Sequence, residues 1–213
     1  VTEIVYSLDD GSTWHAYTAP VTFDQDGIYS FSYRSLDREG NMESVRTIRF
    51  QVDRSAPVIT VDRLNEGRYP SSGSLTPQFT VTDLWSGVDE SKTVVLLDGQ
   101  PVRQGETIHL YTLPLGTHTF TVQAADLAGN AAAAQITFVT YADPESLKSL
   151  VQQFRDNGRI DNAGIANSLL KKLEHGQLQA FIQQVRAQSG KHISAEAADY
   201  LLRDAQAVLN DMP

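Results

Sequence analysis

The sequence of 213 residues contains no cysteine. Disulfide bonds, a thiolate zinc site and a cysteine nucleophile are therefore excluded. Secreted eukaryotic domains of this size usually contain cysteine, so its absence is more typical of a secreted bacterial protein. The sequence also has no apolar run near the roughly 20 residues that a transmembrane helix needs, so we expect no membrane insertion.

Positive charge is scarce as well. The 17 lysines and arginines are outnumbered by 26 aspartates and glutamates, which gives a net charge of −9 and a pI of about 4.9. Because nucleic-acid binding requires a basic surface, we expect no nucleic-acid partner. None of the five histidines is paired at metal-ligand spacing, and neither H-E-x-x-H nor G-x-S-x-G occurs. We therefore assign no catalytic residue and do not expect this chain to be an enzyme.

The most informative feature that is present is an internal repeat. The segment GIYSFSYRSLDREGN (Gly27–Asn41) aligns without gaps on GTHTFTVQAADLAGN (Gly116–Asn130), and TIRFQVDRSAP (Thr47–Pro57) corresponds to QITFVTYADP (Gln135–Pro144). Apolar and polar residues alternate in these segments, as they do in β-strands with one buried face. The repeat period of about 90 residues matches one immunoglobulin-like β-sandwich.

The two copies of the repeat differ in length. Two further strands are predicted in front of the second copy, at Ala56–Leu64 and Leu75–Asp83, whereas nothing equivalent precedes Val1. We therefore predict a partial sandwich over residues 1–54 and a complete one over residues 55–142. The chain is expected to be a fragment cut inside a sandwich, or a truncated gene product. Its first sandwich is expected to be poorly stable, because an unpaired edge and half of its core are exposed.

After Tyr141 the spacing of apolar residues changes from that of strands to that of helices. Asp143 and Pro144 are typical of the cap and the first position of a helix. Four apolar stripes joined by short loops predict a small antiparallel bundle over residues 143–213, docked on the neighbouring sandwich. The stripes comprise Leu147, Leu150, Val151 and Phe154; Ile165, Leu169, Leu170 and Leu173; Leu178, Phe181, Ile182 and Val185; and Ala198, Leu201, Leu202, Ala205 and Leu209. The predicted fold class is thus all-β immunoglobulin-like sandwiches, the first incomplete, followed by a small all-α C-terminal bundle.

The helical part resembles the FIMAH domain, a C-terminal module of secreted bacterial enzymes and surface proteins. The resemblance lies in SLVQQF (Ser149–Phe154), NGRI (Asn157–Ile160), SLLKKLE (Ser168–Glu174) and LQAFIQQVRAQSGKHISAEAADYLLRDA (Leu178–Ala205). The chain departs from that family in the short connection Glu174–Gln177, where a longer helical hairpin is usual. The strand-rich block Tyr6–Glu43 resembles bacterial extracellular immunoglobulin-like repeats, including the type called OmpL47-like.

These resemblances imply an extracellular or cell-surface location and the C-terminal region of a larger secreted bacterial protein. The function that they imply is that of a non-catalytic accessory or spacer region, with the helical tail serving attachment or assembly. The partner would be a catalytic domain upstream in the same polypeptide, of the glycoside hydrolase or polysaccharide lyase kind. Polysaccharide or cell wall is a second expected partner. The alternatives are the stalk of a cell-surface adhesin and a calcium-stabilised carbohydrate-binding module.

The motif Asp-x-x-Gly-Asn occurs at Asp37 and again at Asp126, each time after an alternating strand. In the second sandwich, the loop Thr82–Glu90 and the motif at Asp126 are predicted to meet at one end. Calcium takes roughly six to eight oxygen ligands. The candidate ligands are Asp83, Asp89, Asp126 and Asn130, and calcium is the only bound group that the sequence suggests. The alternative, which we favour, is a structural turn in which the aspartate accepts backbone N–H groups and the glycine adopts positive φ.

Three aromatic residues are candidates for stacking on sugar rings. They are Trp14 and Tyr17 in the segment STWHAY, and Trp85 in the loop after a predicted strand. Packing within the sandwich is the favoured alternative for Trp14 and Tyr17, and both roles stay open for Trp85.

Overall fold

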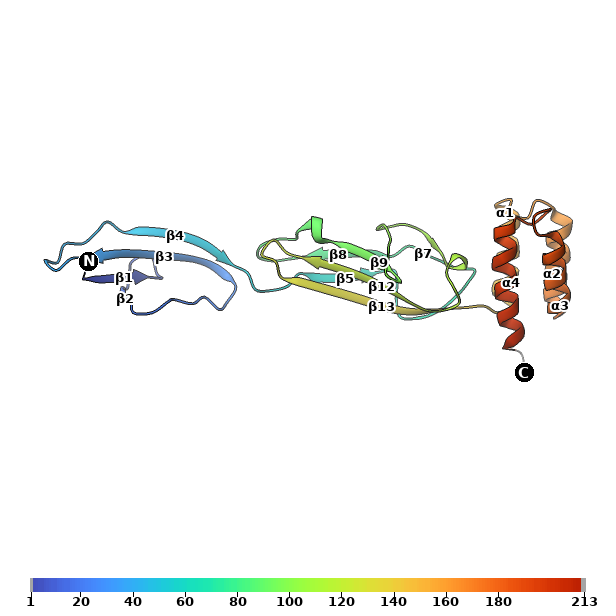
Figure 1. Cartoon of the computed structure of the whole chain (residues 1–213), viewed down its shortest axis with the longest axis horizontal. Helices are drawn as coiled ribbons and strands as arrows, with labels where there is room; N and C mark the ends of the chain where they lie inside the picture. The colour runs from blue at the N-terminus through green and yellow to red at the C-terminus, as the bar shows by residue number, and fades with distance from the viewer. Residues whose placement is uncertain (1, 212–213) are drawn as a thin grey trace. The chain divides into compact units, whose positions relative to one another are not determined.

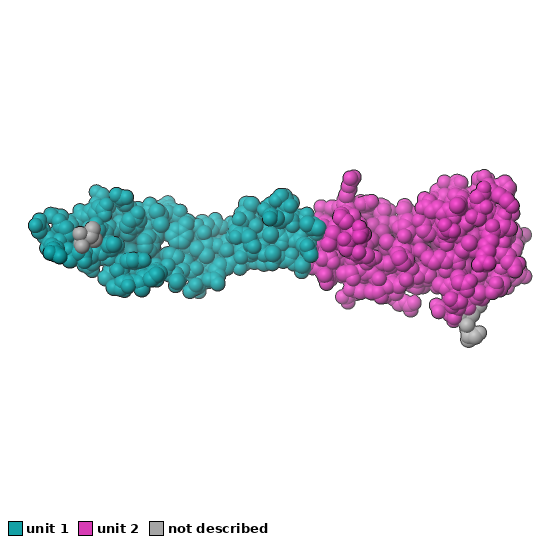
Figure 2. Space-filling view, viewed as in Figure 1, with its two compact units in different colours: residues 1–60, 80–94, 123–133 teal, residues 61–79, 95–122, 134–213 magenta. Residues whose placement is uncertain are grey.

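The computed structural model describes residues 2–211 (Figure 1). In chain order these residues form immunoglobulin-like β-sandwiches, the first of them incomplete, and a small all-α bundle, as the sequence predicts. The chain divides into two compact units (Figure 2). The first unit comprises Val1–Thr60, Thr80–Val94 and Gln123–Ala133, and the second comprises Val61–Phe79, Val95–Val122 and Ala134–Pro213. No helix in the described part of the chain is long and apolar enough to cross a membrane.

The first sandwich consists of one four-stranded sheet in the order β2-β1-β3-β4. Its strands are β1 (Glu3–Ser7), β2 (His15–Ala16), β3 (Gly27–Leu36) and β4 (Arg46–Val52). The pairings are antiparallel, with Tyr6 opposite Tyr33 and Phe31 opposite Ile48. These apolar side chains share one face, because successive residues of a strand point to opposite faces. Among residues 2–54 there is no second sheet to cover that face, in agreement with the predicted incompleteness.

The second sandwich contains a five-stranded sheet in the order β10-β9-β12-β13-β6 and two two-stranded sheets, β11-β7 and β5-β8. Its elements are β5 (Val58–Asp62), β6 (Gly67–Pro70), β7 (Ser74–Leu75), β8 (Gln78–Thr82), the 3-10 helix η1 (Glu90–Lys92), β9 (Val94–Leu97), β10 (Gln100–Pro101), β11 (Ile108–His109), the 3-10 helix η2 (Leu110–Thr112), β12 (Gly116–Ala125) and β13 (Ala131–Tyr141). Strands β5 and β8 are the two that the sequence predicts in front of the second repeat copy. Phe120, Val122 and Phe138 lie in the core and are at most 2% exposed.

The Asp-x-x-Gly-Asn motif forms the same closed turn after β3 and after β12. The Asp37 carboxylate accepts the backbone N–H of Asn41 at 2.9 Å and its side-chain amide at 2.8 Å. The Asp126 carboxylate accepts the same two groups of Asn130, at 2.8 and 2.7 Å. The glycine of each motif has positive φ, 83° and 96°, which an L side chain rarely adopts. Both copies of the motif thus form the turn that the sequence favours, and calcium binding at Asp126 stays a prediction.

The helical bundle comprises α1 (Pro144–Asp156), α2 (Ala163–Glu174), α3 (Leu178–Gln188) and α4 (Ala195–Asn210). Asp143 caps α1 as predicted, since its carboxylate accepts the N–H of Ser146 at 2.7 Å. Most residues of the predicted apolar stripes form the bundle core, whereas Ile165, Leu170 and Leu202 are only partly buried against it. Val208, which the predicted stripe of α4 omits, is also buried, whereas Leu209 is only partly buried. Val208 lies two turns after Leu201 and therefore stays on the same helix face.

The bundle docks on the second sandwich, and Tyr111 of η2 is central to this contact. Tyr111 is 4% exposed and belongs to the same buried cluster as the helices. Its ring centroid lies 5.1 Å from that of Phe154 and 5.2 Å from that of Tyr200. The predicted docking is confirmed, because a side chain from a sandwich loop fills part of the bundle core.

Polar contacts accompany this aromatic one. The Gln153 amide donates to the Ser72 carbonyl at 2.7 Å, and Arg203 donates to the Leu113 carbonyl at 2.6 Å. Arg203 also pairs at 2.7 Å with Asp204, which is fully buried. Burial raises the pKa of Asp204, and the adjacent guanidinium offsets only part of that shift. Helices α1 and α4 are thus joined to sandwich loops by partly buried hydrogen bonds as well as by Tyr111.

The buried carboxyl group of Asp204 predicts a pH dependence of stability. Because its pKa is raised on folding, the stability that it contributes is full below the ordinary value of 3.8 and is lost as pH rises through the folded pKa. Asp204→Asn lacks this titration, so the unfolding midpoint of the variant minus that of the wild type is expected to increase between about pH 3 and about pH 8. Thermal unfolding across this range measures the difference, and a constant or falling difference would contradict the expectation.

Candidate functional site

The loop that follows β8 and the turn that follows β12 meet in the structure, as the sequence predicts. Val88 forms an isolated antiparallel bridge with Asp126, and the N–H of Leu127 donates to the carbonyl of Gly87 at 2.9 Å. These backbone bonds place the side chains of the two loops together. All of them lie within the first compact unit.

Three carboxylates gather at this place. Oxygen atoms of Asp53, Asp83 and Asp126 all lie within 4.8 Å of one another. Asp83 and Asp126 are two of the predicted ligands, whereas Asp53 belongs to the linker after β4. The predicted ligand Asp89 lies outside this cluster, because its carboxylate caps η1 and accepts the N–H of Ser91 at 3.0 Å.

Backbone and amide groups hold the carboxylates of this cluster in position. The Asp83 carboxylate accepts the N–H of Gly87 at 2.8 Å, and that of Asp53 accepts the N–H of Ser86 at 3.0 Å. The predicted ligand Asn130 lies beside them, since its side-chain amide donates to the Asp53 carbonyl at 3.2 Å. The three carboxylates are therefore fixed by contacts that do not neutralise their charge.

Asp126 is 2% exposed, yet it is held in its ionised form. Burial acts to raise the pKa of Asp126, but hydrogen bonds from the side chain and backbone of Asn130 bring it below the usual value. Carboxylates this close repel one another, and none of the ion pairs among residues 2–211 includes them. A cation would relieve this repulsion, and an all-oxygen donor set without thiolate or imidazole suits calcium better than zinc.

The candidate sugar-stacking residues do not form one platform. The Arg34 guanidinium lies 4.1 Å from the ring centroid of Trp14, and Tyr17 packs edge-on against Tyr6 at 6.4 Å. Trp85 is 36% exposed in the loop after β8, next to Leu84, which is 86% exposed. Among the described residues, no aromatic pair joins two of the three candidates. Trp14 is thus packed within its own module, and Trp85 is the candidate that lies beside the carboxylate cluster.

Comparisons with known proteins assign no family. No protein-family model matches the chain, and no curated protein matches it significantly. Solved structures that resemble it include the fibronectin(III)-like modules of Clostridium thermocellum CbhA. That match covers 66% of this chain and 78% of that chain at 14% sequence identity, with a TM-score of 0.32. The fold assignment therefore rests on the strands and helices themselves, and the FIMAH and OmpL47-like resemblances stay predictions.

A buried polar cluster around His118 was not predicted from the sequence. His118 is 3% exposed, and its Nδ1 lies 2.7 Å from the Asp98 carboxylate while its Nε2 lies 2.9 Å from the Thr140 hydroxyl. An acid, an imidazole and a hydroxyl in series are also the parts of a hydrolase triad. Here the Thr140 hydroxyl is buried and donates to the Pro114 carbonyl at 2.8 Å. The hydroxyl is therefore closed to substrate, and the cluster satisfies polar groups inside the second sandwich.

Proposed function

We propose that this chain is a non-catalytic accessory region of a larger secreted bacterial enzyme that degrades polysaccharides, and that it positions the catalytic domain. The observation that supports this best is the junction between the two sandwiches. The linker Asp53–Ser55 is hydrogen-bonded to both modules instead of being free in solvent. A spacer needs such a junction, because a flexible linker would not hold neighbouring domains at a defined distance.

Both modules form hydrogen bonds with this linker. In the first module, the Asp26 carboxylate accepts the backbone N–H of Arg54 at 2.6 Å. In the second, Ser86 donates its N–H to the Asp53 carboxylate at 3.0 Å, and Asn130 donates to the Asp53 carbonyl at 3.2 Å. The linker must therefore break its hydrogen bonds to one of the two modules before the modules can move apart.

The helical bundle is likewise joined to the second sandwich by specific contacts. Tyr111 and the hydrogen bond from Arg203 to the Leu113 carbonyl join the bundle to sandwich loops, so the two pack against each other. We propose that the tail serves attachment or assembly, in line with its resemblance to FIMAH domains. The same junctions would suit the stalk of a cell-surface adhesin. The upstream gene sequence separates the two, since a hydrolase or lyase domain supports an enzyme and a ligand-binding head supports an adhesin.

Limited proteolysis with trypsin tests the junction, because Arg54 offers a cleavage site inside the linker. Cleavage requires local opening, so Asp53→Ala is expected to accelerate it by at least about tenfold relative to the wild type. Asp24→Ala is the matched control, since it removes only an exposed ion pair with Arg54 and should leave the rate nearly unchanged. Wild-type cleavage after Arg54 as fast as in an unfolded peptide would contradict a rigid spacer.

A second candidate function is a calcium-stabilised carbohydrate-binding module. It is favoured by the cluster of Asp53, Asp83 and Asp126 and by the exposed Trp85 in the adjoining loop. Calcium would bind the carboxylates and fix the loop, and the indole ring would then stack on a sugar. Retention on insoluble polysaccharide or cell wall that requires calcium and is lost in Trp85→Ala supports this candidate, and no retention leaves the spacer function.

Calcium itself is tested by thermal unfolding. At a calcium concentration about ten times the dissociation constant, the unfolding midpoint of the wild type is expected to rise by about 5 °C, because the ion binds only the folded loops. Asp83→Asn should abolish the shift. Asp89→Asn should retain it, because Asp89 lies outside the cluster. An unchanged wild-type midpoint at millimolar calcium would remove calcium from the proposal.

A further inference from the structure

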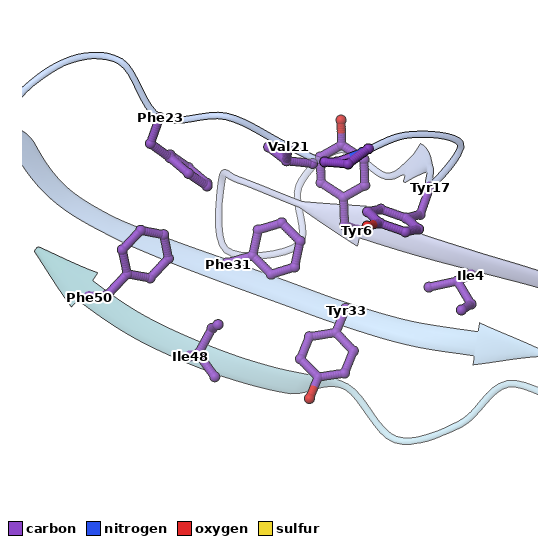
Figure 3. Close-up of a pocket in the computed structure, with 10 residues that line it drawn as sticks. Ile4, Tyr6, Tyr17, Val21, Phe23, Phe31, Tyr33, Ile48 and Phe50 are labelled. Carbon is purple, nitrogen blue, oxygen red and sulfur yellow. The ribbon is translucent and has the colours of Figure 1, made fainter. Parts of the chain in front are cut away.

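An open groove runs over the apolar face of the first sheet (Figure 3). Its volume is about 440 Å³, and Phe31 and Tyr33 of β3 and Ile48 and Phe50 of β4 line it. Phe23 covers one side, with its ring centroid 4.9 Å from that of Phe50. The only polar side-chain atoms among the lining residues are tyrosine hydroxyls. Such a lining offers few fixed hydrogen bonds to a sugar and suits an apolar occupant.

The internal repeat identifies what this face corresponds to. Phe31 of β3 aligns with Phe120 of β12, and Phe50 of β4 corresponds to Phe138 of β13. In the second copy these two rings are 2% and 1% exposed. In the first copy their counterparts Phe31 and Phe50 are only partly buried, and Ile48 beside them is 51% exposed. The same two repeat positions therefore lie in a closed core in one copy and on a partly open face in the other.

The second copy contains a segment that has no counterpart among residues 2–54 of the first. Its residues 56–83 contain β5 and β8, a separate two-stranded sheet in which alternate residues are the more buried ones. They also contain β6, which pairs with β13 in parallel at the edge of the larger sheet. The counterpart of β13 is β4, which is itself the edge of the described sheet in the first module. Within residues 2–54, the open face and the edge strand β4 thus lie where the counterpart of residues 56–83 would pack.

We propose that the groove and the free edge of β4 form a docking surface for a β-strand segment with alternating apolar residues, of the kind that residues 56–83 provide in the second copy. One strand extends the sheet along β4 through main-chain hydrogen bonds, and alternate side chains fill the groove. Covering this face also removes apolar side chains such as the half-exposed Ile48 from water. This docking is independent of the spacer function and of calcium.

The test is to join an additional copy of residues 56–83, through a glycine- and serine-rich linker, to the front of the whole chain. Amide exchange of β4 is expected to slow by at least about tenfold, and fluorescence of the dye ANS bound to the groove to fall. The matched control has the same extension with the alternating apolar residues changed to serine, and should give no protection. The changed positions are Ile59, Val61, Phe79 and Val81.

A second measurement keeps the test decisive if the extended chain does not fold. A synthetic peptide of residues 56–83 is added to the unextended chain, and β4 exchange is followed against peptide concentration. Saturable protection that is lost in Ile48→Ser supports the proposal, since Ile48 is half exposed and its replacement should leave the fold intact. The proposal is overturned if the serine-substituted segment slows β4 exchange as much as the native segment does, or if neither segment slows it. Concentration-dependent dimerisation that protects β4 without the peptide also overturns it, because the occupant is then a second copy.

Discussion

Replacing Phe120 with alanine is expected to destabilise the second sandwich by about 3–5 kcal/mol, because truncating a buried ring leaves a cavity in a closed core. The same change at Phe31, its counterpart in the first repeat copy, is expected to cost only about 1 kcal/mol, since that ring lines an open groove. Phe120 and Phe31 occupy the same repeat position, but only Phe120 lies beneath a second sheet. The difference between the two losses in unfolding free energy therefore measures how much the second sheet stabilises a ring at this position.

The two tryptophans allow each module to be followed separately in the whole chain. Trp14 lies in the first module and Trp85 in the second, so Trp85→Phe and Trp14→Phe backgrounds each report on one sandwich. In the Trp14→Phe background, denaturant unfolding followed by Trp85 fluorescence should show the large loss in unfolding free energy that is expected for Phe120→Ala. Equal losses for Phe31→Ala and Phe120→Ala would mean that the first sheet is as well covered as the second, and would also contradict an open docking surface.

The turns and helices could be predicted because their causes are local in sequence. The carboxylate of Asp126 is satisfied within its own motif, by Asn130, and the Asp143 cap is satisfied by Ser146. The apolar spacing of the helices is also local, so the buried stripes follow from periodicity. The repeat then allowed the strands of both copies to be predicted from one another.

The candidate site could be predicted only in part, because its residues come from distant segments. Asp83 and Asp126 belong to loops that the sandwich topology brings together, and that topology was predictable. Asp53 comes from the linker, and only the folded chain shows its oxygens beside the other two. Asp89 was expected in the cluster, but a nearer partner, the N–H of Ser91, holds its carboxylate. The acidic residue in the linker DRSAP is the sequence signal that could have indicated Asp53.

Tyr111→Ala is expected to destabilise the helical bundle by about 3–5 kcal/mol, although Tyr111 belongs to the sandwich. Its ring lies against Phe154 and Tyr200 inside the bundle core, so truncation opens a cavity among the helices. Sequence periodicity could not show this, because Tyr111 lies outside the four α-helices. Tyr111→Phe is the matched control, since it keeps the ring and removes only the hydroxyl.

Hydrogen exchange of α1 and α4 amides measures this effect directly. If bundle and sandwich loops unfold together, Tyr111→Ala should speed exchange in both helices, and the control should not. A variant in which the helices keep wild-type protection while only η2 loosens would show that the bundle folds by itself. In that case the tail would be a separate module hinged on the sandwich. The hydrogen bond from Arg203 to the Leu113 carbonyl argues for the first result, because undocking would break it and would expose the buried Asp204 that pairs with Arg203.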